Sequence, residues 1–158
     1  MKKELIYGIG GLVAGLLITL IVVYKSAPGL MMVEDESKYS FEETVEVFEK
    51  EVKAAKWKVA GMHDMQAILA DFGHDVKAIK IFELCSSKYS KTILDLDDER
   101  IVSPLMPCRV AIYEKSDGKT YITRMNNTLM AKPFGGVIND VMQQASGETE
   151  VFISKLIK

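Results

Sequence analysis

The sequence predicts an α+β protein, with helices packed on a mostly antiparallel sheet, that follows one N-terminal transmembrane helix. Residues 5–24, LIYGIGGLVAGLLITLIVVY, carry no charged side chain. After them, short β-rich runs alternate with segments in which apolar residues recur at helical spacing, as expected for a domain of mixed composition. Two β-rich runs that adjoin at SDGK, residues 116–119, indicate a hairpin and therefore antiparallel pairing.

The uncharged run has the length of a membrane span. In a helix that rises ~1.5 Å per residue, residues 5–24 reach about 30 Å, the thickness of the hydrocarbon core. Its glycines are ordinary in a span, and Gly11 and Gly15 form a GxxxG pair through which two spans can pack. A cleaved signal peptide is the alternative, but its apolar region is normally ~7–15 residues, and YKSAPG, residues 24–29, is a poor cleavage site.

Charges beside the run predict its orientation. Lys2 and Lys3 precede it, whereas Lys25 alone follows before the acidic EDE segment. This bias predicts a single-pass protein of the cell membrane with a cytoplasmic N-terminus and a periplasmic or extracellular domain. We expect an anchor, then a linker with the breaker sequence SAPG and the first strand, and then one exported domain. Their bounds are 1–25, 26–39 and 40–158.

Caps, spacing and breakers predict the first elements of the exported domain. A strand is expected at 30–36. Ser40 and Glu43 then form a capping box before an amphipathic helix that reaches about residue 56 and whose apolar stripe is core. Asp64 caps a short helix that Gly73 ends. Further strands are expected at 57–65 and 76–84, and a further helix at 86–96.

The last third of the chain begins with the hairpin. It covers 109–125, and Asp117-Gly118 suits a type I′ turn. Gly135-Gly136 opens a helix that Gly147 is expected to end. The chain would then finish as a short helix or an edge strand at 150–158.

The chain has two cysteines, each at the border of a strand-like run. Cys85 follows IFEL, and Cys108 begins the first hairpin strand. In an oxidising exterior a disulfide would close a loop of about 24 residues and stabilise the fold by roughly 3 kcal/mol. Neighbouring thiols could instead form a redox couple, carry sulfur or bind metal, or the two could be separate small buried hydrophobes. We expect their sulfur atoms to lie within bonding or co-ligation reach.

The segments that carry these cysteines resemble a known family. HDMQAILADFG, IFELCSSKYSKTIL and ERIVSPLMPCRVAIYEKSDGKTYITRMN are similar to segments of the DUF302 family, over roughly residues 40–145. The resemblance implies a small α+β sandwich that can pair as a dimer, and it supplies no reaction or cofactor. Many members have Asn-Pro-Lys where this chain has Cys85-Ser86-Ser87-Lys88. The chain therefore resembles a cysteine-bearing, membrane-anchored branch.

His63 and Met65 are further candidate ligands. They lie two residues apart on a predicted strand, so they would share one face. Together with Cys85 and Cys108 they offer the donor types that soft metals and haem iron prefer. The plainer interpretation of His63 is a hydrogen-bonded residue of the core or its rim. The sequence contains no CxxC, CxxCH or HExxH motif and no glycine-rich phosphate loop.

Arg109 and Arg124 could build an anion site beside Cys108. If the turn centres on residues 117 and 118, facing residues have numbers that sum to ~235. Arg109 then faces Asn126, and Arg124 comes close to the same end of the hairpin. A small anion or carboxylate could bind there through charge-assisted hydrogen bonds. Since the chain has 22 acidic residues, arginines paired with surface carboxylates are the alternative.

Composition narrows the function further. A net charge of −2 leaves no basic footprint for nucleic acid, and no serine has a His/Asp partner set typical of a hydrolase. We expect an extracytoplasmic binding or redox-accessory domain for a small sulfur species, a soft metal or haem, built on Cys85, Cys108 and His63. Its partner would be a second copy or another membrane protein. The alternatives are an assembly subunit stabilised by a disulfide and, third, an enzyme with a cysteine nucleophile.

Overall fold

The computed structural model describes residues 2–158 and shows an α+β fold built on one five-stranded sheet. The strand order is β1-β5-β4-β3-β2, and every neighbouring pair is antiparallel. The predicted fold class is therefore confirmed, with β1 and β2 as the edge strands. The strands are β1 Met32–Glu36, β2 Lys58–Asp64, β3 Ile79–Cys85, β4 Cys108–Glu114 and β5 Thr120–Met125.

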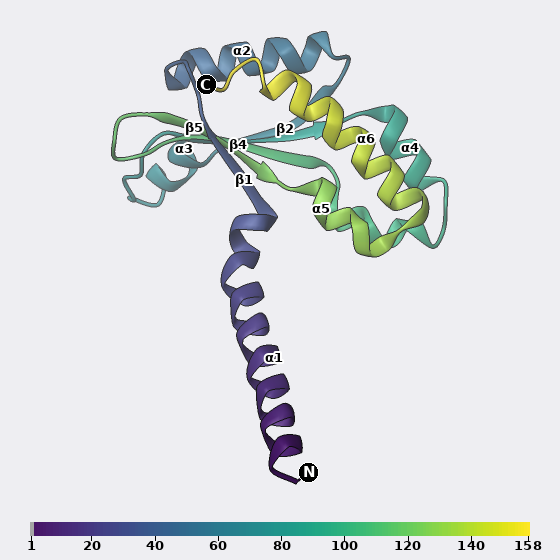
Figure 1. Ribbon diagram of the computed structural model, residues 1–158. Helices are drawn as coiled ribbons and strands as arrows, with labels where there is room; N and C mark the ends of the chain where they lie inside the picture. Colours follow the sequence, from purple (N-terminus) through teal and green to yellow (C-terminus); the bar gives the residue numbers. More distant parts are fainter. Residues whose placement is uncertain (1) are drawn as a thin grey trace.

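Helices cover the two faces of the sheet unequally (Figure 1). α2 and α6 lie across one face, α4 packs beside α6, and the short α3 lies on the other side near β2 and β3. The α-helices are α1 Lys2–Met31, α2 Phe41–Ala54, α3 Met65–Ala70, α4 Ser87–Leu94, α5 Asn127–Ala131 and α6 Gly136–Ile153. The 3₁₀ helices are η1 Glu99–Leu105 and η2 Lys132–Phe134.

The core lies between the sheet and the larger helices. Strand alternation turns Phe82 of β3 and Val110 and Ile112 of β4 toward the helices, and all three side chains are buried. Phe48 of α2 packs on Phe82 with 5.1 Å between the ring centroids. Full burial of each such side chain contributes about 1.5–3 kcal/mol to folding.

α1 runs further than the predicted anchor. The helix continues through SAPG to Met31, and β1 begins at the next residue, so the segment expected as a linker is helical up to the first strand. Pro28 lies inside the helix, where it removes one backbone hydrogen bond. The last carbonyls, of Leu30 and Met31, accept hydrogen bonds from Asn126. The helix is long and apolar enough over Tyr7–Met31 to cross a membrane.

The two predicted N-caps are present. The Ser40 hydroxyl accepts from the Glu43 N–H at 3.4 Å, and the Asp64 carboxylate accepts from the Ala67 N–H at 3.0 Å. These bonds satisfy amide groups that the first turn of a helix leaves without partners. The predicted strands and helices up to α4 are thus confirmed, with ends that differ by a few residues.

The β4–β5 hairpin forms with a register one residue away from the predicted one. Lys115 N–H donates to the carbonyl of Lys119 at 3.0 Å, so residues 116–118 form a three-residue loop. Gly118, with φ +75°, supplies the left-handed residue that such a loop requires, where a two-residue type I′ turn was expected. Val110 therefore faces Arg124. A shift of one residue moves a side chain to the other face of the sheet.

The predicted break at Gly147 is wrong. α6 passes through this residue and ends at Ile153. A glycine inside a helix costs about 0.5–1 kcal/mol relative to alanine, and tertiary packing offsets this cost, because Phe152, Ile153 and Leu156 beyond it are buried. Of the two endings expected for 150–158, the helical one holds for residues 150–153 as part of α6, and Ile157 then makes an isolated bridge to Ser37.

Candidate functional site

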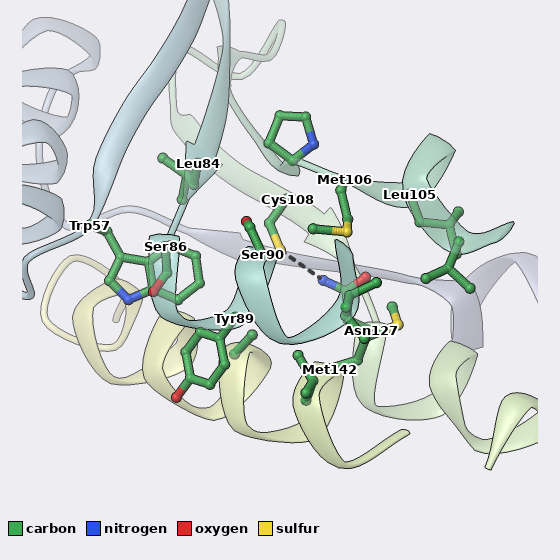
Figure 2. A pocket seen from close by; sticks show the side chains of 15 residues that line it. Trp57, Leu84, Ser86, Tyr89, Ser90, Leu105, Met106, Cys108, Asn127 and Met142 are labelled. Atoms are coloured by element: carbon green, nitrogen blue, oxygen red, sulfur yellow. Dashed lines mark hydrogen bonds between the residues drawn. The ribbon is translucent and has the colours of Figure 1, made fainter. Parts of the chain in front are cut away.

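A pocket lies in the core where β3 and β4 meet α4, α5 and α6 (Figure 2). Its volume is about 50 Å³. The wall is mainly apolar and includes Leu84 and Val141, while Ser90, Cys108 and Asn127 bring polar or sulfur atoms to it. An apolar hollow with a few polar groups is the usual form of a small-ligand site.

Cys108 brings a thiol to this pocket. Asn127 Nδ2 donates a weak hydrogen bond to its Sγ over 3.9 Å, and Figure 2 shows the two side chains turned toward each other. Burial raises the pKa of the Cys108 thiol, and the charge of Cys85 raises it further. The thiol therefore stays protonated at neutral pH, which makes it a weak nucleophile.

A carboxylate outside the pocket orients two of its aromatic walls. Trp57 Nε1 and Tyr89 Oη both donate to Glu148, at 2.8 Å and 2.6 Å. These bonds, that of Tyr89 first, lower the pKa of the Glu148 carboxyl. Burial and then the bond to Glu148 raise the pKa of the Tyr89 hydroxyl. Glu148 thus holds two rings in one arrangement: that of Trp57, just before β2, and that of Tyr89 in α4.

Cys85 does not line the pocket of Cys108, although it lies behind the pocket residue Ser90. Leu84 is the residue that faces Cys108 across β3 and β4, whereas Cys85 faces Lys58 on β2. The Cys85 sulfur lies 3.4 Å from the hydroxyl of Ser90. Both cysteines are free thiols, so the disulfide considered from the sequence is not formed. Cys85 nevertheless remains close enough to Cys108 for its charge to raise the pKa of that thiol.

His63 and Met65 lie away from the cysteines. His63 faces Ile81 on β3, which precedes Cys85 by four residues, or about 13 Å along a strand. Met65 is the first residue of α3, so it does not continue the strand that carries His63. The predicted ligand set of these two residues with Cys85 and Cys108 is therefore not assembled. Within residues 2–158, no group of three or more His, Cys, Asp or Glu side chains is placed to hold a metal ion.

Arg109 lies on the opposite face of the sheet, here called the uncovered face because α2, α4 and α6 leave it free and α3 borders it only near β2 and β3. Its Nε and Nη2 donate to Glu83 Oε1 at 3.2 Å and 3.0 Å. His63 Nε2 lies 3.5 Å from the same oxygen. Gly61 faces Glu83, and a Cβ atom there would approach its carboxylate to 3.0 Å, so the glycine leaves room for this group. Two predicted site residues, Arg109 and His63, thus meet through a carboxylate that the sequence analysis did not select.

Arg124 lies on the helix-covered face. Its Nε donates to Glu150 of α6 at 2.8 Å, and its Nη1 donates to Asp35 of β1. The side chain is 6% exposed, compared with 62% for Arg109. The predicted anion site shared by the two arginines is absent, because the three-residue loop places them on opposite faces.

The sequence analysis missed Asn127, Met106 and Glu148. The adjacent residue Asn126 accepts from Leu129 N–H as the N-cap of α5. Asparagine is a favoured N-cap, so this signal could have predicted α5 and placed Asn127 in its first turn. Met106 and Glu148 carry no comparable local signal, because only the packing of η1 and α6 brings them to the pocket and its wall.

Comparisons with known proteins support the fold. No curated protein matches the chain significantly. The crystal structure of an uncharacterized conserved DUF302 protein from Bacillus stearothermophilus has a TM-score of 0.72 to this chain at 16% identity, and the match covers 80% of this chain and 98% of that one. The family model for DUF302, a domain of unknown function, matches residues 33–157, from the second residue of β1 nearly to the chain end. The chain therefore belongs to the DUF302 family.

Proposed function

We propose that this chain is a membrane-anchored extracytoplasmic binding domain whose Cys108 pocket holds a small soft ligand, either a sulfur species or a soft metal ion. The observation that carries the proposal is the apolar cavity of about 50 Å³ into which a thiol is turned. His63 and Cys85, which were expected to join the site, lie outside the pocket. No catalytic turnover is part of the proposal.

The volume of the cavity favours a ligand of a few atoms. One water needs roughly 10–15 Å³ of such space, so about 50 Å³ holds only a few heavy atoms. This size favours a small sulfur species or a single ion over haem. The sulfur-containing residues of the lining favour a soft ligand. Cys108, Met106 and Met142 all border the same space, and thiolate and thioether donors select soft ions such as Cu(I).

The state of the thiol predicts how a metal ion would bind. Burial raises the pKa of Cys108, so the free site carries S–H. Binding of a monovalent soft ion forms a sulfur–metal bond and releases the thiol proton to solvent, with no change of oxidation state. Affinity therefore rises with pH, because protons and metal compete for one sulfur.

α1 supports the anchored part of the proposal. The stretch Tyr7–Met31 has a mean hydropathy of 2.1 over its most apolar window, and none of that window is buried by the domain. A helix of this kind that stands free in Figure 1 would expose a large apolar surface to water. The cytoplasmic N-terminus follows from Lys2 and Lys3 before the span.

The test is Cu(I) titration of the full-length chain in detergent under reducing conditions, with a competing chelator as readout. We expect one ion per wild-type chain, loss of that ion in Cys108→Ser, and unchanged binding in Cys85→Ser. Ala145→Leu fills the pocket but keeps the thiol, so it should also weaken binding. Equal affinity of wild type and Cys108→Ser for Cu(I) would exclude the metal branch.

The sulfur branch is tested on the chain isolated from its native membrane. Native mass spectrometry without reductant, which keeps non-covalent ligands bound, should show a sulfur-containing adduct on wild type and on Cys85→Ser but not on Cys108→Ser. Metal analysis and a visible spectrum on the same sample detect a resident ion or haem. If neither an adduct nor Cu(I) binding depends on Cys108, the proposed site is wrong.

An assembly role is the second candidate, and the uncovered face of the sheet favours it. Ile81 and Ala111 face each other there, and α2, α4 and α6 all pack on the opposite side. Two copies could pair through this face. Light scattering in detergent should then give the mass of two chains for wild type and of one for Ile81→Arg, whereas a one-chain mass for wild type would contradict the dimer.

A further inference from the structure

α5 and η2, together residues 127–134, pack on α6 and also lie beside the end of α1. α5 contacts α1. In Figure 1, α5 lies at about the height of the junction of α1 with β1, and the segment after it lies lower in the view, on the side from which α1 leaves. The same segment borders the pocket through Asn127. Its position relative to a membrane therefore depends on how firmly α1 holds the domain.

Asn126 fixes that relation. Its Nδ2 donates to the carbonyl of Leu30 at 3.0 Å, and its N–H donates to the carbonyl of Met31 at 2.8 Å. Its Oδ1 accepts from Leu129 N–H at 3.1 Å and so caps α5. One residue thus joins the end of α1, the end of β5 and the start of α5. Since β1 follows Met31 directly, a flexible linker does not separate the domain from the helix.

The length of α1 places this junction close to the lipid. The uncharged run ends at Tyr24, and Lys25 is the first charged residue after it. From Lys25 to Met31 the helix rises only about 9 Å at ~1.5 Å per residue. The polar layer on each side of the hydrocarbon core is roughly 5–8 Å thick. The underside of the domain therefore begins at the outer border of the headgroups.

The side chains of this segment suit that position. Leu129 and Phe134 are exposed, and Phe134 remains 48% accessible in the folded domain. Lys132 lies between them, and residues 126–139, NNTLMAKPFGGVIN, contain no acidic side chain. Its one charged side chain, that of Lys132, is positive, in a chain whose net charge is −2. Apolar side chains next to a lysine are the usual composition of a lipid-surface contact.

We propose that α5 and η2 dock on the bilayer surface beside the anchor, with Leu129 and Phe134 at the border of headgroups and acyl chains and Lys132 near lipid phosphates. This inference rests on the membrane anchor of the proposed function but not on the pocket ligand. Docking would fix the domain at two places, the span and this segment. It would also hold the Asn127 wall of the pocket at the membrane surface.

The test places a tryptophan on the segment in the full-length chain, reconstituted in vesicles of phosphatidylcholine and phosphatidylglycerol. Phe134→Trp is compared with Val151→Trp, a matched control on α6 that is 64% exposed and near the far end of that helix. Trp57 is buried, so its signal is subtracted with the wild-type chain. With acyl chains brominated near the headgroup, we expect at least about twofold stronger quenching of Phe134→Trp, since docked apolar side chains enter ~5–10 Å into this boundary.

A third variant separates failure of docking from failure of the anchor. Leu16→Trp lies in the middle of the span and should be quenched by chains brominated near their methyl ends. If Leu16→Trp is quenched but Phe134→Trp is quenched no more than Val151→Trp, the docking is overturned and the membrane anchor stands. Absence of quenching in Leu16→Trp overturns both. Lys132→Glu in the Phe134→Trp chain should reduce quenching on anionic vesicles, and an unchanged signal overturns the role of the lysine.

Discussion

The two faces of the sheet are built from the same strands, yet they carry different chemistry. On β3 and β4, Phe82 and Val110 face the helices and are buried. Their neighbours on the same strands, Glu83 on β3 and Arg109 on β4, face the uncovered side and pair with each other. The pocket lies at the end of the apolar face, where Cys108 follows the same alternation as Val110. A thiol in this position is desolvated, whereas the titratable groups of the other face remain near water.

The two arginines show the same difference at a single residue type. Arg124 reaches across the covered face to carboxylates on β1 and α6, and it links three elements. Arg109 pairs with a carboxylate on the neighbouring strand at the uncovered surface. Exposed pairs contribute little to stability, because both charges remain solvated. A cation held inside the fold leaves its partners uncompensated when it is removed.

The largest expected effect is on the covered face. Phe82→Ala should reduce the free energy of unfolding by about 3–5 kcal/mol, because it leaves a cavity beside Phe48 in the core. Denaturant unfolding of the full chain in detergent, followed by Trp57 fluorescence, measures this loss. Ile81→Ala on the uncovered face is the control and should lose less than half as much. Equal losses would show that both faces are packed to the same degree.

The next largest loss of stability is expected on replacing one of the two arginines, Arg124. Arg124→Met should cost about 1–3 kcal/mol of unfolding free energy, because it deprives Asp35 and Glu150 of their partner while both stay partly hydrated. Arg109→Met should cost less than about 1 kcal/mol. The same unfolding experiment compares the two variants. A loss for Arg109→Met that matches or exceeds the loss for Arg124→Met would reverse the assignment of the faces.

Glu148 tests the frame of the pocket through pH. Hydrogen bonds from Tyr89 and Trp57 hold its pKa below the ordinary value of 4.5. The folded carboxylate therefore stabilises the protein above that value, and the stabilisation is lost as the pH falls through the folded pKa. In Glu148→Gln this titration is gone, so Tm should fall less steeply on acidification than in wild type. Parallel Tm profiles for the two proteins would refute the role of this carboxylate.

The smallest effect concerns the reactivity of the thiol. Because burial raises the pKa of Cys108, alkylation of Cys85→Ser by iodoacetamide should be slow at neutral pH and should accelerate as the pH rises past the ordinary thiol value. Intact mass spectrometry follows the reaction, with Cys108→Ser as the chain that reports Cys85 alone. Rapid alkylation of Cys108 at neutral pH would be inconsistent with a desolvated thiol.

Much of the fold could be predicted from local signals. Ser40 and Asp64 cap helices with bonds that involve residues three positions away, and the uncharged run over 5–24 needs only its own composition to predict an apolar helix. The exceptions are places where distant packing outweighs a local preference. Gly147 does not end α6, because residues beyond it are buried against the rest of the fold.

The candidate site could be predicted only in part, and the reason is register. Cys108 was selected from the sequence as the start of a strand, and it does line a pocket. Its partners were not identified, because the length of the hairpin loop decides which face Arg124 takes, and Leu84 rather than the next residue, Cys85, pairs with Cys108. Side chains alternate with a period of two, so an error of one position in a predicted strand pairing places every side chain on the wrong face relative to its neighbours.

The sequence alone determined features that depend on residues close together in the chain: the free apolar helix, the caps, the strands and the antiparallel order of the hairpin. Only the tertiary structure decided which side chains meet, from the pairing of Arg109 with Glu83 to the joining of α1 and α5 by Asn126. Hydrogen bonds between backbone neighbours follow from local geometry. The contacts of a pocket require segments far apart in the chain to pack in one register, and no short stretch of sequence contains that information.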